Sequence, residues 1–149
     1  MKLATRRLAV MVFMVTFSLL FLAAGQAQAD NSLKIQVICP ATVTPEIPFN
    51  LTIKAYNFTS SSITFNRVVV AYANPDLTIR GPYVVSSATT TVPKRISESE
   101  PTLKTFSVPL KIMTTQPSGT LVPILVTLWY NQYTAGYARG AGAGAAKIK

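Results

Sequence analysis

The run from Leu121 to Gln132, LVPILVTLWYNQ, constrains the fold more than any other stretch beyond the N-terminal segment. Val122, Ile124 and Val126 begin a series of apolar residues at every second position, which predicts a β-strand with this face toward a core. The intervening residues are also largely apolar. A strand that is apolar on both faces is typical of the middle of a sheet or of a sheet covered by a second layer. We therefore expect the central strand of a small β-sandwich here.

Residues 1–29 have the anatomy of a secretory signal peptide. Three basic residues flank the start of an apolar run from Leu8 to Ala24, and Ala27-Gln28-Ala29 forms an A-x-A cleavage site. We expect cleavage before Asp30 and export to the periplasm or the cell exterior, with membrane contact only through this segment during export. The apolar run of about 17 residues is at the lower limit of a membrane span, so an uncleaved anchor is the alternative.

The chain from Asp30 onward contains about 120 residues, which is enough to bury one core. It retains eleven basic and five acidic residues, and the basic residues stand singly except at Lys94-Arg95. This pattern favours solubility, with a weakly anionic partner such as a cell-wall polymer as the alternative. Nucleic acid is not expected as a partner, because an exported chain without a basic run lacks the usual charge pattern.

The residues that most catalytic sites require are scarce. The chain has no histidine, which excludes Ser-His-Asp and Cys-His arrangements and His-ligated metals. Cys39 is the only cysteine, so we expect a buried thiol at a strand end, with an intermolecular disulfide as the alternative. Glu98 and Glu100 lie in a Ser/Pro-rich stretch that disfavours a catalytic pair or a calcium site. We therefore predict no enzyme activity, no cofactor and no metal site.

Alternating apolar residues predict further strands, with the clearest alternations at 33–38, 49–56 and 103–113. Pro109 indicates that the last of these has an open side. Gly81-Pro82 interrupts a shorter strand at 77–85, which indicates a sheet edge or a switch between sheets. Within 63–73 the parity of the apolar residues changes near Asn66-Arg67, which predicts a β-bulge.

Two parts of the chain are less regular. Residues 86–102 are expected to form a long surface connection with a short strand at 89–92. The Gly/Ala-rich segment 136–149 has little side chain to pack, and such segments are often mobile. Its end, 146–149, is expected to add at most a last short strand beside the central one. No helical period is evident beyond the signal peptide.

About seven short strands in a chain of this size indicate an immunoglobulin-like β-sandwich. The segment PFNLTIKAYNFTSSSITFNRVVVAY, after a first strand and a Pro-bearing turn, resembles the opening of bacterial CARDB-type domains. Pro117-Ser118-Gly119-Thr120 and the following strand look like that family's penultimate strand, and AKIK looks like its last. The resemblance covers 33–131 and implies a non-catalytic module of surface or exported proteins.

The predicted organisation is all-β: a cleaved signal peptide at 1–29, an immunoglobulin-like sandwich of about seven antiparallel strands at 30–135, and a Gly/Ala-rich tail at 136–149. By parity, Tyr56, Trp129 and Tyr133 escape the core, and such aromatic rings stack on sugars or bury a partner's side chains. Packing against a neighbouring sheet or loop is the alternative.

We therefore expect an exported, non-enzymatic interaction or structural module of the cell envelope, whose partner is a protein or an envelope glycan. A carbohydrate-binding module that uses the three aromatics is the first alternative. A hydrolase is the second and is less favoured.

Overall fold

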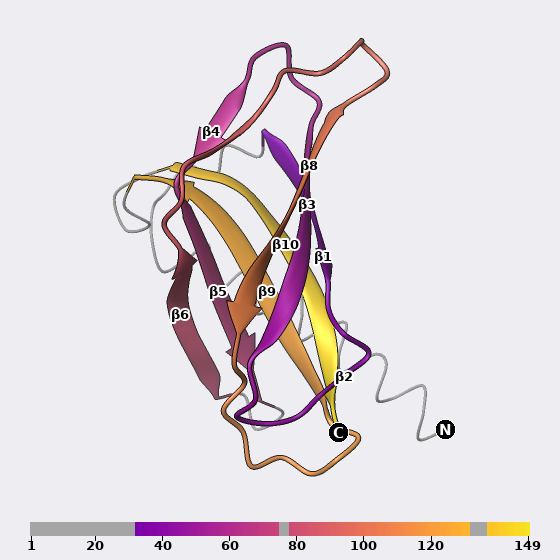
Figure 1. Ribbon diagram of the computed structural model, residues 1–149, viewed down its shortest axis with the longest axis vertical. Coiled ribbons are helices and arrows are strands. Elements are labelled where there is room, and N and C mark those ends of the chain that lie inside the picture. Colours follow the sequence, from indigo (N-terminus) through magenta and orange to yellow (C-terminus); the bar gives the residue numbers. More distant parts are fainter. Residues whose placement is uncertain (1–31, 75–77, 132–136) are drawn as a thin grey trace.

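The computed structural model describes residues 32–74, 78–131 and 137–149, and its regular secondary structure there is entirely β-strand (Figure 1). Within these ranges, no helix is long and apolar enough to span a membrane. The expected signal peptide at 1–29 and the predicted mature N-terminus lie outside the described residues, and so does Tyr133.

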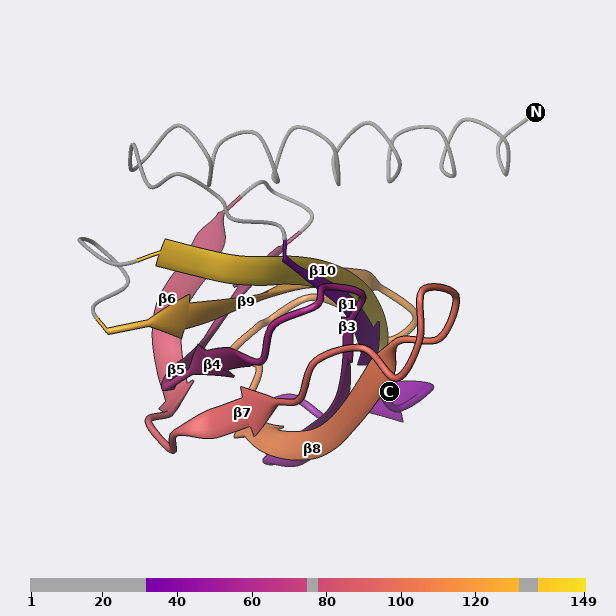
Figure 2. The same ribbon diagram turned by 90° about the horizontal axis from the view of Figure 1, so that it is seen from above.

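In the described part of the chain, ten strands form two large sheets and one small one. They are β1 (Leu33–Ile38), β2 (Thr42–Val43), β3 (Phe49–Asn57), β4 (Ile63–Phe65), β5 (Arg67–Ala73), β6 (Ile79–Ser86), β7 (Thr90–Val92), β8 (Thr102–Leu110), β9 (Leu121–Tyr130) and β10 (Tyr137–Ile148). The sheet orders are β2-β10-β9-β5-β6, β1-β3-β8 and β4-β7. The first two sheets form the layers of a sandwich, and β4-β7 lies toward one end (Figure 1 and Figure 2). The expectation of about seven antiparallel strands is therefore corrected to ten, with β2 and β10 paired in parallel.

The strand β9 is the expected central strand, because it is the third of five in its sheet. Val122, Val126 and Leu128 on its inner face are fully buried in the main core, which draws on both layers. Its outer face is also buried: Leu125 forms a small second cluster with two alanines of β5. Burial on both faces explains why this run has no polar face.

Most strand positions agree with the sequence prediction, including β1, β3, β7 and β8. The segment 63–73 differs, because Asn66 separates β4 in the small sheet from β5 in the large one. The Asn66 backbone N–H donates to the Trp129 carbonyl at 2.9 Å, and its side-chain oxygen accepts from the Asn131 N–H at 2.7 Å. The change of parity therefore marks a strand that switches sheets and not a β-bulge within one ladder.

The strand β6 lies at the edge of the five-stranded sheet, as Gly81-Pro82 indicated. The two residues do not end the strand; its ladder with β5 shifts register between Val70 and Tyr72. Gly81 has a φ of 101°, and a Cβ added there would lie 2.9 Å from the Val70 carbonyl oxygen. Only glycine fits this position without strain.

The Gly/Ala-rich segment, expected to pack little, forms the twelve-residue strand β10. It pairs with β9 from Tyr137 to Lys147, and its glycines face β1. A Cβ added at Gly140 would lie 2.5 Å from the Leu33 carbonyl oxygen, and one at Gly142 would lie 2.8 Å from that of Ile35. Because these glycines have no side chain, the two layers approach closely here. Composition alone did not reveal this packing role.

Asn57 fixes the end of β3 from a fully buried position. Its side-chain nitrogen lies within hydrogen-bonding distance of the carbonyls of Ser61 (2.8 Å), Val92 (3.2 Å) and Pro93 (2.9 Å). Its side-chain oxygen accepts from the backbone N–H and the hydroxyl of Thr59. One side chain therefore joins β3, the loop that follows it and the end of β7.

Candidate functional site

The structure does not bring the predicted aromatic residues together. Tyr56 projects from the outer face of the three-stranded sheet, where its hydroxyl donates to the Gln36 side-chain oxygen at 3.2 Å. Trp129 belongs to the other sheet and is only 8% exposed, with its indole N–H donating to the Thr127 hydroxyl at 2.9 Å. The expectation that Trp129 escapes the core is therefore wrong, since both faces of β9 are buried there. Tyr133 lies outside the described residues.

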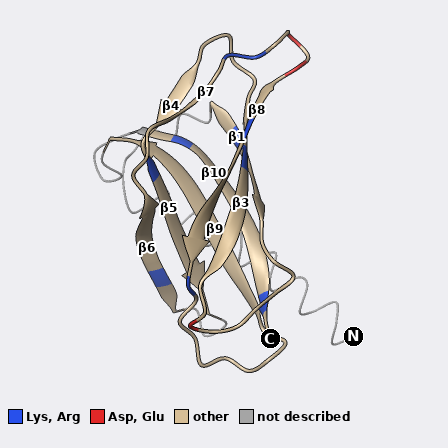
Figure 3. Cartoon of the chain, in the orientation of Figure 1, with Lys and Arg blue, Asp and Glu red and all other residues tan. Residues whose placement is uncertain are grey.

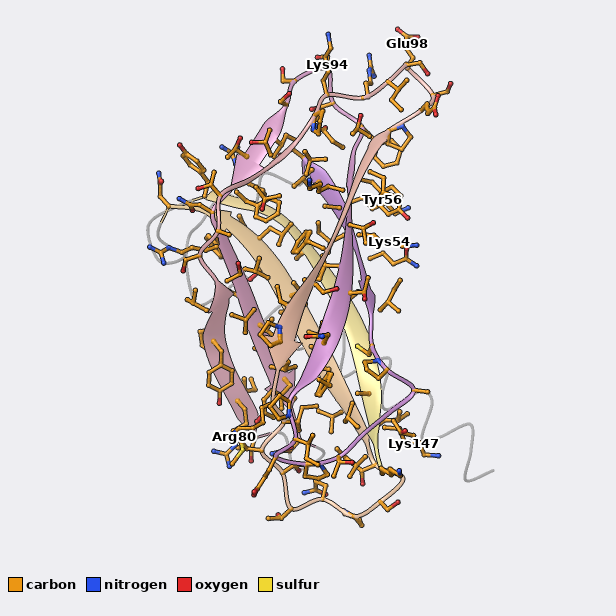
Figure 4. All side chains as sticks on the ribbon, viewed as in Figure 1. Lys54, Tyr56, Arg80, Lys94, Glu98 and Lys147 are labelled. Carbon is orange, nitrogen blue, oxygen red and sulfur yellow. The ribbon has the colours of Figure 1, made fainter. Side chains whose placement is uncertain are left out.

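Glu98 and Glu100 occupy an exposed turn between β7 and β8. The Glu100 backbone N–H donates to the Ser97 carbonyl at 3.3 Å, and the Ile96 N–H donates to the Glu100 carbonyl at 2.9 Å. Figure 4 places Glu98 at the opposite end of the molecule from Arg80 on β6. Solvated carboxylates on a turn lack the apolar surroundings that a glycosidase general acid requires.

A cleft of about 270 Å³ opens where the edge strand of one layer faces the edge strand of the other. It lies between β6 and the end of β8 with the residues that follow. Its lining residues are Tyr83, Val85, Pro109, Leu110, Lys111 and Met113. Five of these six side chains are apolar or aromatic, so the cleft offers a hydrophobic surface with a single cation at its rim. Its volume suits a few side chains of a partner better than a drug-sized ligand.

The buried Tyr72 positions one wall of this cleft. Its hydroxyl accepts from the Met113 backbone N–H at 2.7 Å and donates to the Met113 carbonyl at 3.3 Å. Its ring stacks on Tyr83, with the ring centroids 6.2 Å apart and the planes at 28°. A tyrosine hydroxyl is neutral at physiological pH, and burial raises the pKa of Tyr72 further, so the hydroxyl can both donate and accept here. The cleft is therefore preformed and anchored to the core.

Part of this cleft could be anticipated from sequence patterns. Gly81-Pro82 and Pro109 marked the two edge strands, and both edges are present. The approach of Tyr83 to Met113 could not be anticipated, because nothing in either segment specifies which edges of the two layers face one another.

Cys39 follows β1 directly and is half-buried. Burial raises the pKa of its thiol to about 11, so the reactive thiolate is rare at neutral pH. A Cβ added at Gly144 would lie 2.8 Å from the Cys39 sulfur, which places this thiol against β10. Within residues 32–74, 78–131 and 137–149, no three His, Cys, Asp or Glu side chains gather in a way that could hold a metal ion.

No protein-family model matches the chain, and no curated protein matches it. Among solved structures, it is similar to the CARDB domain of the PF1109 protein from Pyrococcus furiosus, at 8% identity over 78% of this chain and 87% of that one, with a TM-score of 0.44. It is also similar to PapD-like domain 7 of human CEP192, at 7% identity over 80% and 83% of the two chains, with a TM-score of 0.40.

A third similar structure is the alkylpurine DNA glycosylase AlkC of Pseudomonas fluorescens, at 15% identity and a TM-score of 0.45. The match covers 87% of this chain and only 33% of that one. The CARDB-type domain that the sequence resembles is thus among the similar solved structures. At these identities the likeness concerns the arrangement of strands alone.

Proposed function

We propose that the protein is an exported, non-enzymatic β-sandwich that acts as an interaction or structural module of the cell envelope. The observation that carries this proposal is the apolar cleft between β6 and the segment after β8. Tyr83 and Met113 in its lining are each 42% exposed, and Pro109 and Lys111 beside them are exposed as well. Exposed apolar residues that gather in one place mark interaction surfaces more often than those scattered singly.

Export is supported by the signal-peptide pattern of residues 1–29. N-terminal sequencing of exported protein tests this part of the proposal. A mature chain that begins at Asp30 agrees with it, whereas one that retains Met1 is an uncleaved anchor.

The interaction surface is tested with the variant Tyr83→Ser/Met113→Ser in the exported full-length chain. The matched control is Ile47→Ser/Leu121→Ser, because these two residues are 58% and 48% exposed and lie outside the cleft. In envelope fractions washed with excess soluble acidic polysaccharide, which competes for glycan contacts elsewhere on the molecule, we expect the wild type and the control to be retained and the cleft variant to be released. Equal retention of all three proteins would contradict the role of the cleft.

In the alternative of carbohydrate binding, Trp129 cannot contribute, because a buried ring cannot stack on a sugar. Tyr56 can contribute, because it lies on an open sheet face with charged and amide side chains around it. This face is a different surface from the cleft.

A further inference from the structure

The three-stranded sheet carries charge of one sign only. The strands β1, β3 and β8 contain three lysines and no acidic residue. The acidic residues among the described part of the chain, Glu46, Glu98 and Glu100, lie in loops, as Figure 3 shows. No carboxylate within the sheet therefore neutralises its lysines.

The strand register gathers four polar side chains on the outer face of this sheet. Lys34 lies opposite Tyr56, and Gln36 lies opposite Lys54. We call these four residues the Tyr56 block. Directly opposite residues have Cβ atoms about 5 Å apart and diagonal ones about 7–8 Å apart, so both lysines are neighbours of Tyr56, Lys34 across the ladder and Lys54 two positions along the same strand. Figure 4 shows Lys54 and Tyr56 projecting on the same side, away from the body of the sandwich.

The contacts within the block prepare it for a ligand. The Tyr56 hydroxyl donates to the Gln36 oxygen, which restrains the ring and leaves the Gln36 amide group as a donor. Lys34 and Lys54 repel each other across the diagonal, and an anion between them would relieve this repulsion. On β8, Leu103 lies opposite Tyr56 and Thr105 lies opposite Lys54.

We propose that the Tyr56 block binds a carboxylated polysaccharide. A sugar ring packs on the Tyr56 ring, carboxylates of the polymer pair with the Lys34 and Lys54 ammonium groups, and the Gln36 amide donates to a sugar hydroxyl. An exposed face that carries cations, an amide and hydroxyls suits an extended polar chain. This assignment gives the glycan partner of the proposed function a chemical class and a surface separate from the cleft.

Binding is tested with the full-length exported protein and polygalacturonate as the probe, by native affinity electrophoresis. We expect Lys34→Gln/Lys54→Gln to weaken binding about tenfold or more, since it removes both cations of the block. The matched control is Lys147→Gln/Lys149→Gln, which removes the same charge at two exposed positions at the end of the chain, where β10 belongs to the other sheet (Figure 4 labels Lys147). We expect this control to weaken binding no more than about twofold.

Two further variants test the role of the Tyr56 ring. Tyr56→Ala removes the ring and weakens binding, whereas Tyr56→Phe keeps the ring and retains most of it. Equal losses in both lysine double variants would overturn the assignment in favour of general charge attraction. Equal binding of neutral dextran would also overturn it. Binding to phosphatidylglycerol vesicles without binding to polygalacturonate would assign the face to a membrane surface instead.

The cleft variant Tyr83→Ser/Met113→Ser separates the two proposals, because it leaves the Tyr56 block intact. We expect it to bind polygalacturonate as the wild type does. Loss of polygalacturonate binding in this variant would assign the glycan to the cleft and overturn the role of the block.

Discussion

The two sides of the sandwich close in opposite ways. On one side, β1 lies directly on β10, where glycines replace side chains and the backbones come together. On the other side, β6 and β8 are the edges of their sheets, and the side chains of Tyr83 and Met113 line a cleft between them. The same two layers therefore make a sealed side and an open side, and the difference lies in side-chain volume at the points where they meet.

This difference shows that glycines and large side chains have different roles at the two places where the layers meet. Packed sheets usually lie about 10 Å apart because side chains fill the space between them. Glycine at alternate positions of β10 removes that spacer, so the two strands approach closely on the sealed side. On the open side, large side chains remain and have no opposing strand to cover them, so hydrophobic surface is left for a partner.

We expect the largest loss of stability when a side chain is inserted between β1 and β10 on the sealed side. Gly142→Val would place its Cβ 2.8 Å from the Ile35 carbonyl oxygen, a backbone atom that cannot move alone. We expect a loss of about 3 kcal/mol or more in the free energy of unfolding, measured by urea denaturation. Ala143→Val is the control, because Ala143 is exposed and belongs to the alternate, non-glycine positions; it should change stability by less than about 0.5 kcal/mol. Equal midpoints for both variants would show that β1 and β10 are not in close contact.

The end of the sandwich where β4 and β7 lie depends on Asn57. Asn57→Ala would leave the carbonyls of Val92 and Pro93 without their donor, and the loop after β3 without its acceptor. We expect a loss of about 2–3 kcal/mol, because buried polar groups would be left unpaired. The control Asn50→Ala changes an exposed asparagine of the same strand. Similar small effects for both substitutions would mean that water replaces the Asn57 contacts.

The Cys39 thiol lies on the sealed side, and its ionisation provides a pH-dependent probe of burial there. Burial raises the pKa of Cys39 from 9.0 to about 11, so folding favours the protonated thiol. The corresponding stability is fully present below pH 9 and is lost as the pH rises toward 11. We expect slow alkylation by iodoacetamide at pH 8 in the folded protein and fast alkylation in urea. Equally fast alkylation in both states would show an open Cys39 site and would favour the intermolecular disulfide.

The open side should tolerate substitution best. Tyr83→Ser/Met113→Ser removes exposed surface and the stacking of Tyr83 on Tyr72, so we expect a loss of only about 1 kcal/mol. Thermal denaturation measures this directly beside Gly142→Val. A loss as large as that of Gly142→Val would mean that the cleft residues hold the fold together and are not reserved for a partner.

Sequence patterns located the strands whose side chains alternate. β1 and β3 were visible because one face of each is buried, and alternation reports that directly. β9 was visible as a long apolar run, because both of its faces are buried. β10 was largely missed, since glycine and alanine carry no hydrophobic pattern and their role depends on β1 lying against them. Parity placed Trp129 on the outer face of its strand but could not show that this face is buried.

The site was only partly predictable for the same reason. The edge strands were marked by Gly81-Pro82 and Pro109, and Tyr56 was placed on an outer face. The position of Tyr83 and Met113 in one cleft depends on strand order, and the pairing of Lys34 with Tyr56 depends on register. These are long-range properties that no local window of sequence encodes.

The position of β10 also has a consequence for how the chain folds. It is the last strand in chain order, yet it lies between β2 and β9 and against β1, so segments from opposite ends of the domain must meet. Contacts between distant segments slow folding, because loop-closure entropy is spent before the contacts form. Until β10 arrives, the apolar strand β9 has an unpaired edge and is open to association with other chains. The folding rate and the yield of monomer should therefore depend on how soon this strand docks.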